Sequence, residues 1–271
     1  MSTILIGCDP EVFVQKNNVF LSAFGLIFGD KINPQRVANG AVQVDGMALE
    51  FNIDPAASQE EFLFNVTSVL SQMRQMVPDY DVVVSPVAHF TAEYMKDQPA
   101  AAKELGCDPD FNAWDGGAPN PKPDGERLFR TAAGHIHIGW TQDQDTNDIV
   151  HQDRCNLVAR ELDFYLALPS LFYDNDTERR EMYGKAGCVR YKPYGVEYRT
   201  LSNMWLQSPE LIQWVYRSTI KCVRATMAGQ SLSNKWGDIQ DIVNSSDKAA
   251  AMSIIEKESL EMPNVPISIV G

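Results

Sequence analysis

Four segments of the chain alternate polar and apolar residues with a period of two. Their polar pairs are Asp9 and Glu11, Glu50 and Asn52, His135 and His137, and Glu197 and Arg199. Side chains at positions i and i+2 of a β-strand point to the same face of a sheet. The spacing therefore predicts strands that bury one face and present ionisable groups on the other. A single such pair is also typical of the wet face of a half-exposed sheet.

The composition of the four pairs favours a specific site over a generic wet face. A solvent face usually carries Thr, Lys, Ser and Gln, whereas these pairs carry carboxylates, two of the chain's four histidines and an arginine. Carboxylates that converge on one face repel each other unless a cation lies between them. Oxygen ligands with one or two imidazoles suit Mg²⁺ or Mn²⁺ better than a closed zinc site. Divalent ions beside arginine are also what triphosphate chemistry requires.

Turn residues and helical spacing predict the remaining elements. We expect strands over 3–15 with a kink at Pro10, over 19–24, over 40–53 around an Asp45-Gly46 turn, over 80–87, over 131–141 and within 188–201. We expect helices from the N-cap Ser58 to Pro78, over 147–168 up to Pro169, and from Ser208-Pro209 towards Met227. This order predicts one α+β domain over residues 1–271, with a mainly antiparallel sheet and helices on one face.

Two segments stand outside this pattern. Residues 95–126 are rich in proline and glycine and are expected to form a long irregular loop. A substrate lid and an acidic surface loop both fit that segment. Residues 230–271 are expected to form a C-terminal helical tail.

The overall composition excludes several classes of function. The 271 residues carry a formal charge of −13, which argues against nonspecific nucleic-acid binding and against an anionic membrane surface. Five widely spaced cysteines without a Cys-x-x-Cys pair indicate buried, reduced thiols. No signal peptide or membrane-spanning run is visible. We therefore expect a cytoplasmic protein, in the host cytoplasm if it is phage-encoded; its oligomeric state stays open.

Five segments together carry a resemblance to a known family: GCDPEVFV, VQVDGMALEFN, GCDPDFNAW, RTAAGHIHIGW and YGKAGCVRYKPYGVEYRTLSNMW. They resemble the phage-type carboxylate–amine ligases, COOH–NH2 ligase type 2, of the glutamine synthetase-like superfamily, which includes glutamate–cysteine ligases. The resemblance covers residues 3–206 and is most specific over 183–205. It implies a curved, mainly antiparallel sheet like the glutamine synthetase catalytic domain. One sheet face would form a funnel that ATP enters at one end and the acid and amine substrates at the other.

The resemblance also implies roles for individual residues. The best candidates for Mg²⁺ or Mn²⁺ ligands are Glu11, Glu50, His135 and Glu197, followed by Asp9 and His137. Arg199, Glu50 and Glu197 would act in catalysis, with Arg199 on the γ-phosphate or the acyl phosphate. Arg190, Lys185 and Arg130 are further candidates for binding ATP, although all three also fit as ordinary surface cations. The implied reaction phosphorylates a small-molecule or peptide carboxylate with ATP, and an amine then displaces phosphate to form an amide.

Two other classes of function remain open. A metal-dependent amide or phosphoester hydrolase also uses His-x-His with nearby acids, but such sites usually need further histidines, and only His89 and His151 remain. An inactive ligase-like binding module is the third class. The retained set of carboxylates, histidines and arginine argues against it.

Overall fold

The computed structural model describes residues 3–103, 110–121 and 127–264. Its strands follow one another along an antiparallel sheet in the order β3-β4-β5-β1-β11-β13-β12-β8-β9, with β2 and β6 also paired to β1. A separate two-stranded sheet pairs β7 with β10. The strand bounds are β1 Leu5–Lys16, β2 Val19–Leu21, β3 Gln35–Val37, β4 Gly40–Asp45, β5 Ala48–Ile53, β6 Asp81–Val83, β7 Val87–His89, β8 Phe111–Asn112, β9 Ala118–Pro119, β10 Phe129–Thr131, β11 Gly134–Gly139, β12 Cys188–Lys192 and β13 Gly195–Tyr198. The expected α+β class with an antiparallel sheet is confirmed.

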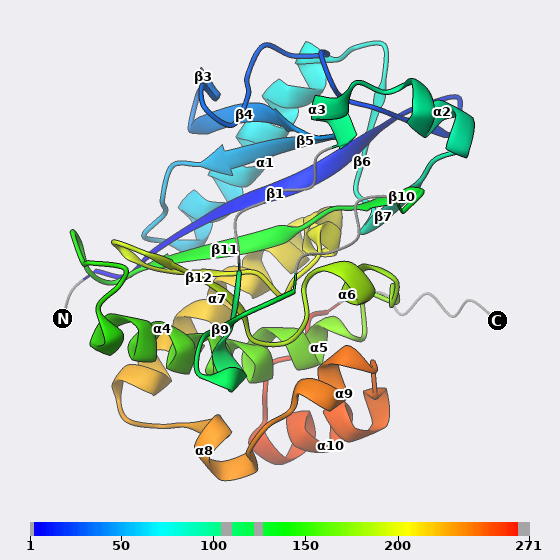
Figure 1. Ribbon diagram of the computed structural model, residues 1–271. Coiled ribbons are helices and arrows are strands. Elements are labelled where there is room, and N and C mark those ends of the chain that lie inside the picture. Colours follow the sequence, from blue (N-terminus) through cyan, green and yellow to red (C-terminus); the bar gives the residue numbers. More distant parts are fainter. Residues whose placement is uncertain (1–2, 104–109, 122–126, 265–271) are drawn as a thin grey trace.

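Helices cover the apolar face of this sheet, as expected (Figure 1). The helix bounds are α1 Gln59–Met76, α2 Ala92–Asp97, α3 Ala100–Lys103, α4 Ile149–Leu162, α5 Leu168–Ser170, α6 Arg179–Met182, α7 Pro209–Met227, α8 Leu232–Trp236, α9 Gln240–Asn244 and α10 Lys248–Glu258. Ser58 caps α1, and Ser208 caps α7 with Pro209 in its first turn, as the sequence predicts. The main core joins α1, α4 and α7 to one face of the central strands.

The strand alternation decides which residues enter that core. In β1, Ile6, Cys8, Val12 and Val14 are buried against the helices. The side chains between them, including Asp9, belong to the opposite face. The same alternation in β5, β11, β13 and β12 gives the sheet one apolar face and one face with polar groups. We call the latter the polar face.

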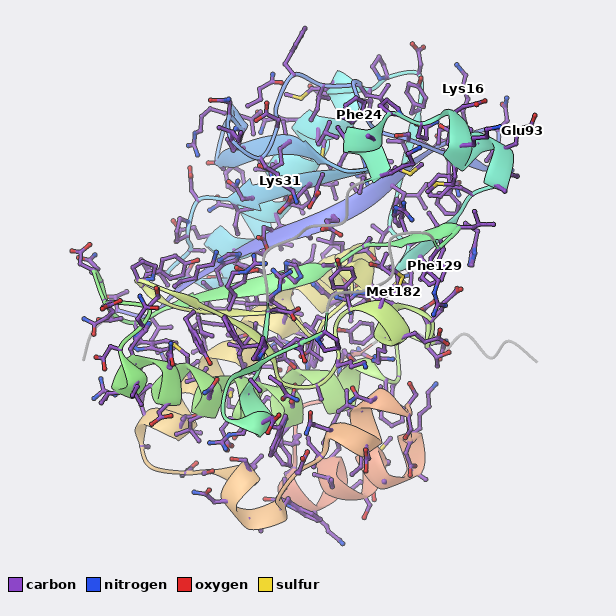
Figure 2. The ribbon with its side chains drawn as sticks, viewed as in Figure 1. Lys16, Phe24, Lys31, Glu93, Phe129 and Met182 are labelled. Carbon is purple, nitrogen blue, oxygen red and sulfur yellow. The ribbon has the colours of Figure 1, made fainter. Side chains whose placement is uncertain are left out.

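The far end of the polar face is covered by a second hydrophobic cluster. Phe13 of β1 packs there with Met47, Phe90 and Met95, the last of which belongs to α2. Phe129 and Met182 form part of a smaller cluster beside it (Figure 2). These contacts limit the open part of the polar face to the region around Asp9.

Three differences from the expected elements occur at prolines. Strand β1 runs straight through Pro10, because Pro10 lies where β1 ends its pairing with β11 and Glu11 begins the pairing with β5. The expected strand over 80–87 is two strands, because Pro86 interrupts it and β6 and β7 pair with different partners. The expected helix end at Pro169 is wrong: a wider π-helical turn, Asp163–Ala167, lets the chain continue to Ser170.

The segment 95–126 contains regular elements in its described part. Helix α3, strands β8 and β9 and the 3₁₀ turn Ala113–Asp115 lie within it, so the described part is not an irregular loop. Residues 104–109 and 122–126 lie outside the described residues, and the first half of the GCDPDFNAW segment falls there. The thiols of Cys8, Cys155, Cys188 and Cys222 are free and buried, as expected, and Cys107 is outside the described part. No helix in the described residues has the length and apolarity needed to cross a membrane.

Candidate active site

Strand register brings the predicted residues together on the polar face. Asp9 of β1 is the pairing partner of His135 of β11, and His137 is the partner of Glu197 of β13. On the other side of β1, Glu11 pairs directly with Glu50 of β5. Residues from segments almost 190 positions apart (197 − 9 = 188) therefore become neighbours across four adjacent strands.

Asp9, His135, His137 and Glu197 form one group, which we call the imidazole cluster. Nδ1 of His135 lies 3.3 Å from Oδ1 of Asp9 and 3.6 Å from Oε1 of Glu197. Nε2 of His137 lies 3.0 Å from the same Asp9 oxygen, and its Nδ1 is hydrogen-bonded to the Tyr194 hydroxyl. Ligand atoms of Asp9, His135 and Glu197 lie within 4.8 Å of one another, close enough to hold one metal ion. Two carboxylates with an imidazole fit Mn²⁺ or Mg²⁺.

Glu197 is also the centre of a cluster of cationic side chains. Its carboxylate is fully buried and contacts Nη1 of Arg190 at 3.3 Å and Nζ of Lys192 at 2.9 Å. Arg199 also donates to it and lies 3.6 Å from Asp110. Arg190, Lys192 and Arg199 balance the charges of Glu197, Asp9 and Asp110 and place their N–H groups beside the imidazole cluster. Such N–H groups can bind phosphate oxygens.

The electrostatics of the imidazole cluster keep its carboxylates ionised. Burial and the nearby Asp9 raise the pKa of Glu197, but Arg199 and the two histidines outweigh them and lower it to about 2. Burial also raises the pKa of Asp9, yet His137 and His135 hold it well below its ordinary range. Burial, with Arg199 beside it, lowers the pKa of His135 to about 4, so this imidazole is neutral at pH 7 and has a lone pair for a metal.

The second group consists of Glu11, Glu50 and Asp45, which we call the carboxylate cluster. Burial and the neighbouring Asp45 raise the pKa of Glu11 to about 7. Burial and the nearby acids raise the pKa of Glu50 well above its ordinary value. Gln43 donates to Glu50 over 2.6 Å, and the backbone N–H of Ala133 donates to Glu11 over 2.8 Å. These carboxylates repel one another, and a bound divalent cation would relieve that repulsion.

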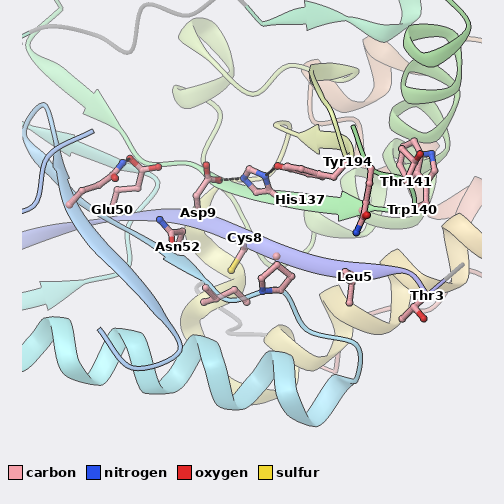
Figure 3. Close-up of a pocket in the computed structure, with 16 residues that line it drawn as sticks. Thr3, Leu5, Cys8, Asp9, Glu50, Asn52, His137, Trp140, Thr141 and Tyr194 are labelled. Atoms are coloured by element: carbon pink, nitrogen blue, oxygen red, sulfur yellow. Dashed lines mark hydrogen bonds and ion pairs between the residues drawn. The ribbon is translucent and has the colours of Figure 1, made fainter. Parts of the chain in front are cut away.

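An open cavity of about 860 Å³ runs along the polar face. Figure 3 shows Glu50 and Asn52 at one end, Trp140 and Thr141 at the other, and Asp9 and His137 between them. The cavity therefore has an acidic end, a middle lined by Asp9 and His137 and an end with aromatic surface. Its size is in the range of cofactor and substrate sites.

Residues 130–258 match the model of a known family, described as phage phiEco32-like COOH·NH2 ligase type 2. This segment is similar to that ligase family. The match confirms the resemblance seen in the sequence and supports a carboxylate–amine ligase. It contains His135, His137, Glu197 and Arg199, whereas Asp9, Glu11 and Glu50 lie upstream of it. No curated protein matches the chain.

Two of the predicted nucleotide-binding cations lie apart from the imidazole cluster. Arg130 is buried, and its guanidinium donates to the backbone carbonyls of Arg127, Phe129 and Lys103 at 2.8, 2.9 and 3.3 Å. Lys185 is exposed, and its carbonyl oxygen accepts from the Thr200 hydroxyl at 3.1 Å. Arg190 and Arg199, in contrast, both reach Glu197. Roles for Arg130 and Lys185 in binding ATP stay predictions.

Sequence reasoning missed three residues of the candidate site. Lys192 follows Arg190 at i+2 on β12, so the rule that found the other polar pairs also applies to it. Gln43 occupies the equivalent face of β4 opposite Glu50. Tyr194 lies in the turn between β12 and β13, where no periodic pattern marks it. Only the folded chain shows its contact with His137.

Proposed function

We propose that the protein is an ATP- and Mg²⁺-dependent carboxylate–amine ligase that forms an amide or peptide bond through an acyl phosphate. The observation that carries the proposal is the imidazole cluster beside three cations, all of them except Asp9 within the segment that matches the ligase family. Metal ligands and guanidinium groups at one place suit the charge of a triphosphate. The proposal treats residues 1–271 as a single catalytic domain.

The chain's own residues would bind and orient the reactants. Asp9, His135 and Glu197 would hold one divalent ion, with His137 fixed against Asp9. Glu11 and Glu50 would supply ligands for divalent cations at the acidic end. A bound divalent ion supplies charge neutralisation for phosphate oxygens and acyl groups.

Cations of the site would then stabilise charge on the transferring phosphoryl group. Arg199 is held by Glu197 and Asp110, so its guanidinium is oriented before a substrate arrives. Arg190 and Lys192 are partly exposed, at 23% and 27% of their side chains, and face the same carboxylate. Because Arg199 is already oriented, less rearrangement of the protein is needed when negative charge develops on the transferring phosphoryl group. The substrates would be a small-molecule or peptide carboxylate and an amine.

The proposal is tested by measuring ADP and phosphate release with panels of acids and amines in Mg²⁺ or Mn²⁺. Nucleotide turnover that needs both an acid and an amine, with the amide detected by mass spectrometry, is the expected result. Metal-dependent cleavage without nucleotide would instead identify a hydrolase. Retained biological activity in Glu11→Ala, Glu50→Ala and Glu197→Ala, with nucleotide binding intact, would identify a binding module.

A further inference from the structure

Two glycines on the polar face have no structural reason to be glycine. Among the glycines that the structure describes, all but Gly7 and Gly139 either have a positive φ or would place a Cβ within 3.0 Å of another atom. A Cβ added to Gly7 would lie 3.6 Å from its nearest neighbour, and one added to Gly139 would lie 3.7 Å away. Both are ordinary van der Waals distances. The backbone and the packing would therefore accept alanine at both positions.

Both glycines line the cavity, on adjacent strands. Gly139 of β11 is the pairing partner of Leu5, and Gly7 of β1 is the partner of His137. Without side chains they leave a strip of bare sheet backbone as a floor, which we call the glycine floor. Trp140 and Tyr194 border the same end of the cavity (Figure 3). A flat ring can lie on such a floor and contact the aromatic walls.

The position of the glycine floor relative to the charges identifies its occupant. Gly7 lies two residues from Asp9, about 7 Å along the strand, on the side away from Glu11 and Glu50. The acidic end of the cavity and its aromatic end lie on opposite sides of Asp9. With the triphosphate at the imidazole cluster and divalent cations at the acidic end, the space left for the rest of the nucleotide lies over Gly7 and Gly139.

We propose that Gly7 and Gly139 form the floor of a site for the base and sugar of a nucleoside triphosphate, with Trp140 and Tyr194 as its walls. The inference rests on the proposed function, since it uses the phosphate position that this function gives. Thr3, Thr141 and Gln142 line the same end and offer hydrogen-bonding groups to the edge of a base. A side chain at either glycine lifts the ring from the backbone and removes these contacts.

The test compares Mg²⁺·ATP with Mg²⁺·tripolyphosphate, which lacks base and sugar. Both are titrated calorimetrically into the full chain and into Gly7→Ala, Gly139→Ala, Gly7→Val and Trp140→Ala. Gly7→Ala and Gly139→Ala should keep the wild-type melting temperature, whereas Trp140→Ala loses packing against the core. All three should bind ATP about tenfold or more weakly. Their affinity for tripolyphosphate should not change. Trp140→Phe, which keeps a ring, should bind ATP more tightly than Trp140→Ala.

Two further variants serve as controls. Gly134→Ala should lower the melting temperature, because its Cβ would lie 2.3 Å from both the Ser202 carbonyl oxygen and Trp205 Nε1. Ala38→Val adds bulk at an exposed position outside the cavity and should change neither stability nor affinity. Together they separate misfolding and added volume from loss of a ligand contact.

Three results would overturn the inference: unchanged ATP affinity in both valine and alanine variants, a parallel loss of tripolyphosphate binding, or no ATP binding by the wild-type chain. The proposed function fails separately. If ATP binds in a manner that depends on the glycine floor but no acid and amine pair is joined, the base site stands and the ligase reaction does not.

Discussion

The two clusters on the polar face contain similar acids but are electrostatically opposite. In the imidazole cluster, Glu197 is surrounded by three cations and two histidines, and its pKa falls to about 2. In the carboxylate cluster, Glu11 and Glu50 are pairing partners and burial raises the pKa of both. Lys31, which lies beside β4 and β5 (Figure 2), contacts Asp45 at 2.8 Å.

The difference shows how one sheet face can prepare two kinds of binding. The imidazole cluster satisfies its charges within the protein, so it is preorganised and rigid before any ligand arrives. The carboxylate cluster keeps unfavourable repulsion that a divalent cation would relieve. We therefore expect that removing a carboxylate charge destabilises the imidazole cluster but reduces the repulsion within the carboxylate cluster.

Glu197→Gln should have the largest effect. Glutamine fits the space but leaves Arg190, Lys192 and Arg199 without their shared negative charge. We expect the free energy of unfolding to fall by about 3 kcal/mol. We also expect ligase activity to fall by about 10³-fold, because Arg199 loses its orientation. Chemical denaturation and amide formation measure the two effects.

Glu258→Gln is the matched control for this change. Glu258 pairs with Lys235 at 2.7 Å and accepts from Trp236 Nε1 at 2.8 Å, remote from the cavity. The control should retain wild-type activity and lose less stability than Glu197→Gln, because it leaves one cation and not three without a carboxylate. If Glu197→Gln behaves like Glu258→Gln, the cations around Glu197 are held by other contacts. The claim that Glu197 organises the imidazole cluster would then be wrong.

Metal binding should stabilise the wild-type protein by a smaller amount. Mn²⁺ at a hundred times its dissociation constant raises the free energy of unfolding by about 2.7 kcal/mol for one site. The double variant Asp9→Asn, His135→Ala should lose this gain at the imidazole cluster, because it removes two of the three ligands. Thermal melts over a range of Mn²⁺ concentrations measure it. An undiminished gain in the double variant would place the bound ion elsewhere.

The polar face was predictable because side-chain alternation depends only on sequence spacing. That rule found Asp9, His135 and Glu197 on one face, and their register then followed from the antiparallel pairing. The neighbours of each residue were not predictable, since they depend on which strands pair. From the sequence, Glu197 was predicted only as a metal ligand and catalytic residue. The pairing of β12 with β13 shows that its carboxylate also contacts Arg190 and Lys192. The direction of each pKa shift likewise depends on burial, which spacing does not give.

The carboxylate cluster should make stability fall as pH rises. The pKa of Glu11 is about 7 in the folded protein, against an ordinary value of 4.5. Between these values the folded chain binds more protons than the unfolded chain. The contribution of Glu11 to stability is therefore fully present below pH 4.5 and is lost as pH rises through 7. Allowing for the partial exposure of Glu11, we expect a loss of about 1–2 kcal/mol between pH 5 and 8.

Glu11→Gln isolates this contribution. Glutamine can still accept the Ala133 N–H but does not titrate, so the difference in stability between variant and wild type should widen as pH rises from 5 to 8. His135 and Asp163 titrate in both proteins and cancel in that difference, whereas Glu50 loses the repulsion of Glu11 in the variant and its pKa falls. Denaturant titrations at four pH values are sufficient. A difference that is constant with pH would show that Glu11 is ionised in the folded state throughout.

Lys31→Ala should have the smallest effect on stability and the most specific one on metal binding. The pair with Asp45 is half exposed at the lysine, so its loss should cost less than about 1 kcal/mol. Removing this positive charge leaves the carboxylate cluster more repulsive and frees it for a divalent ion. The stabilisation by Mn²⁺ should therefore increase in Lys31→Ala, whereas Lys235→Ala, which breaks a remote surface pair, should leave it unchanged. A decrease in Lys31→Ala would mean that Lys31 orders the cluster for the metal and does not compete with it.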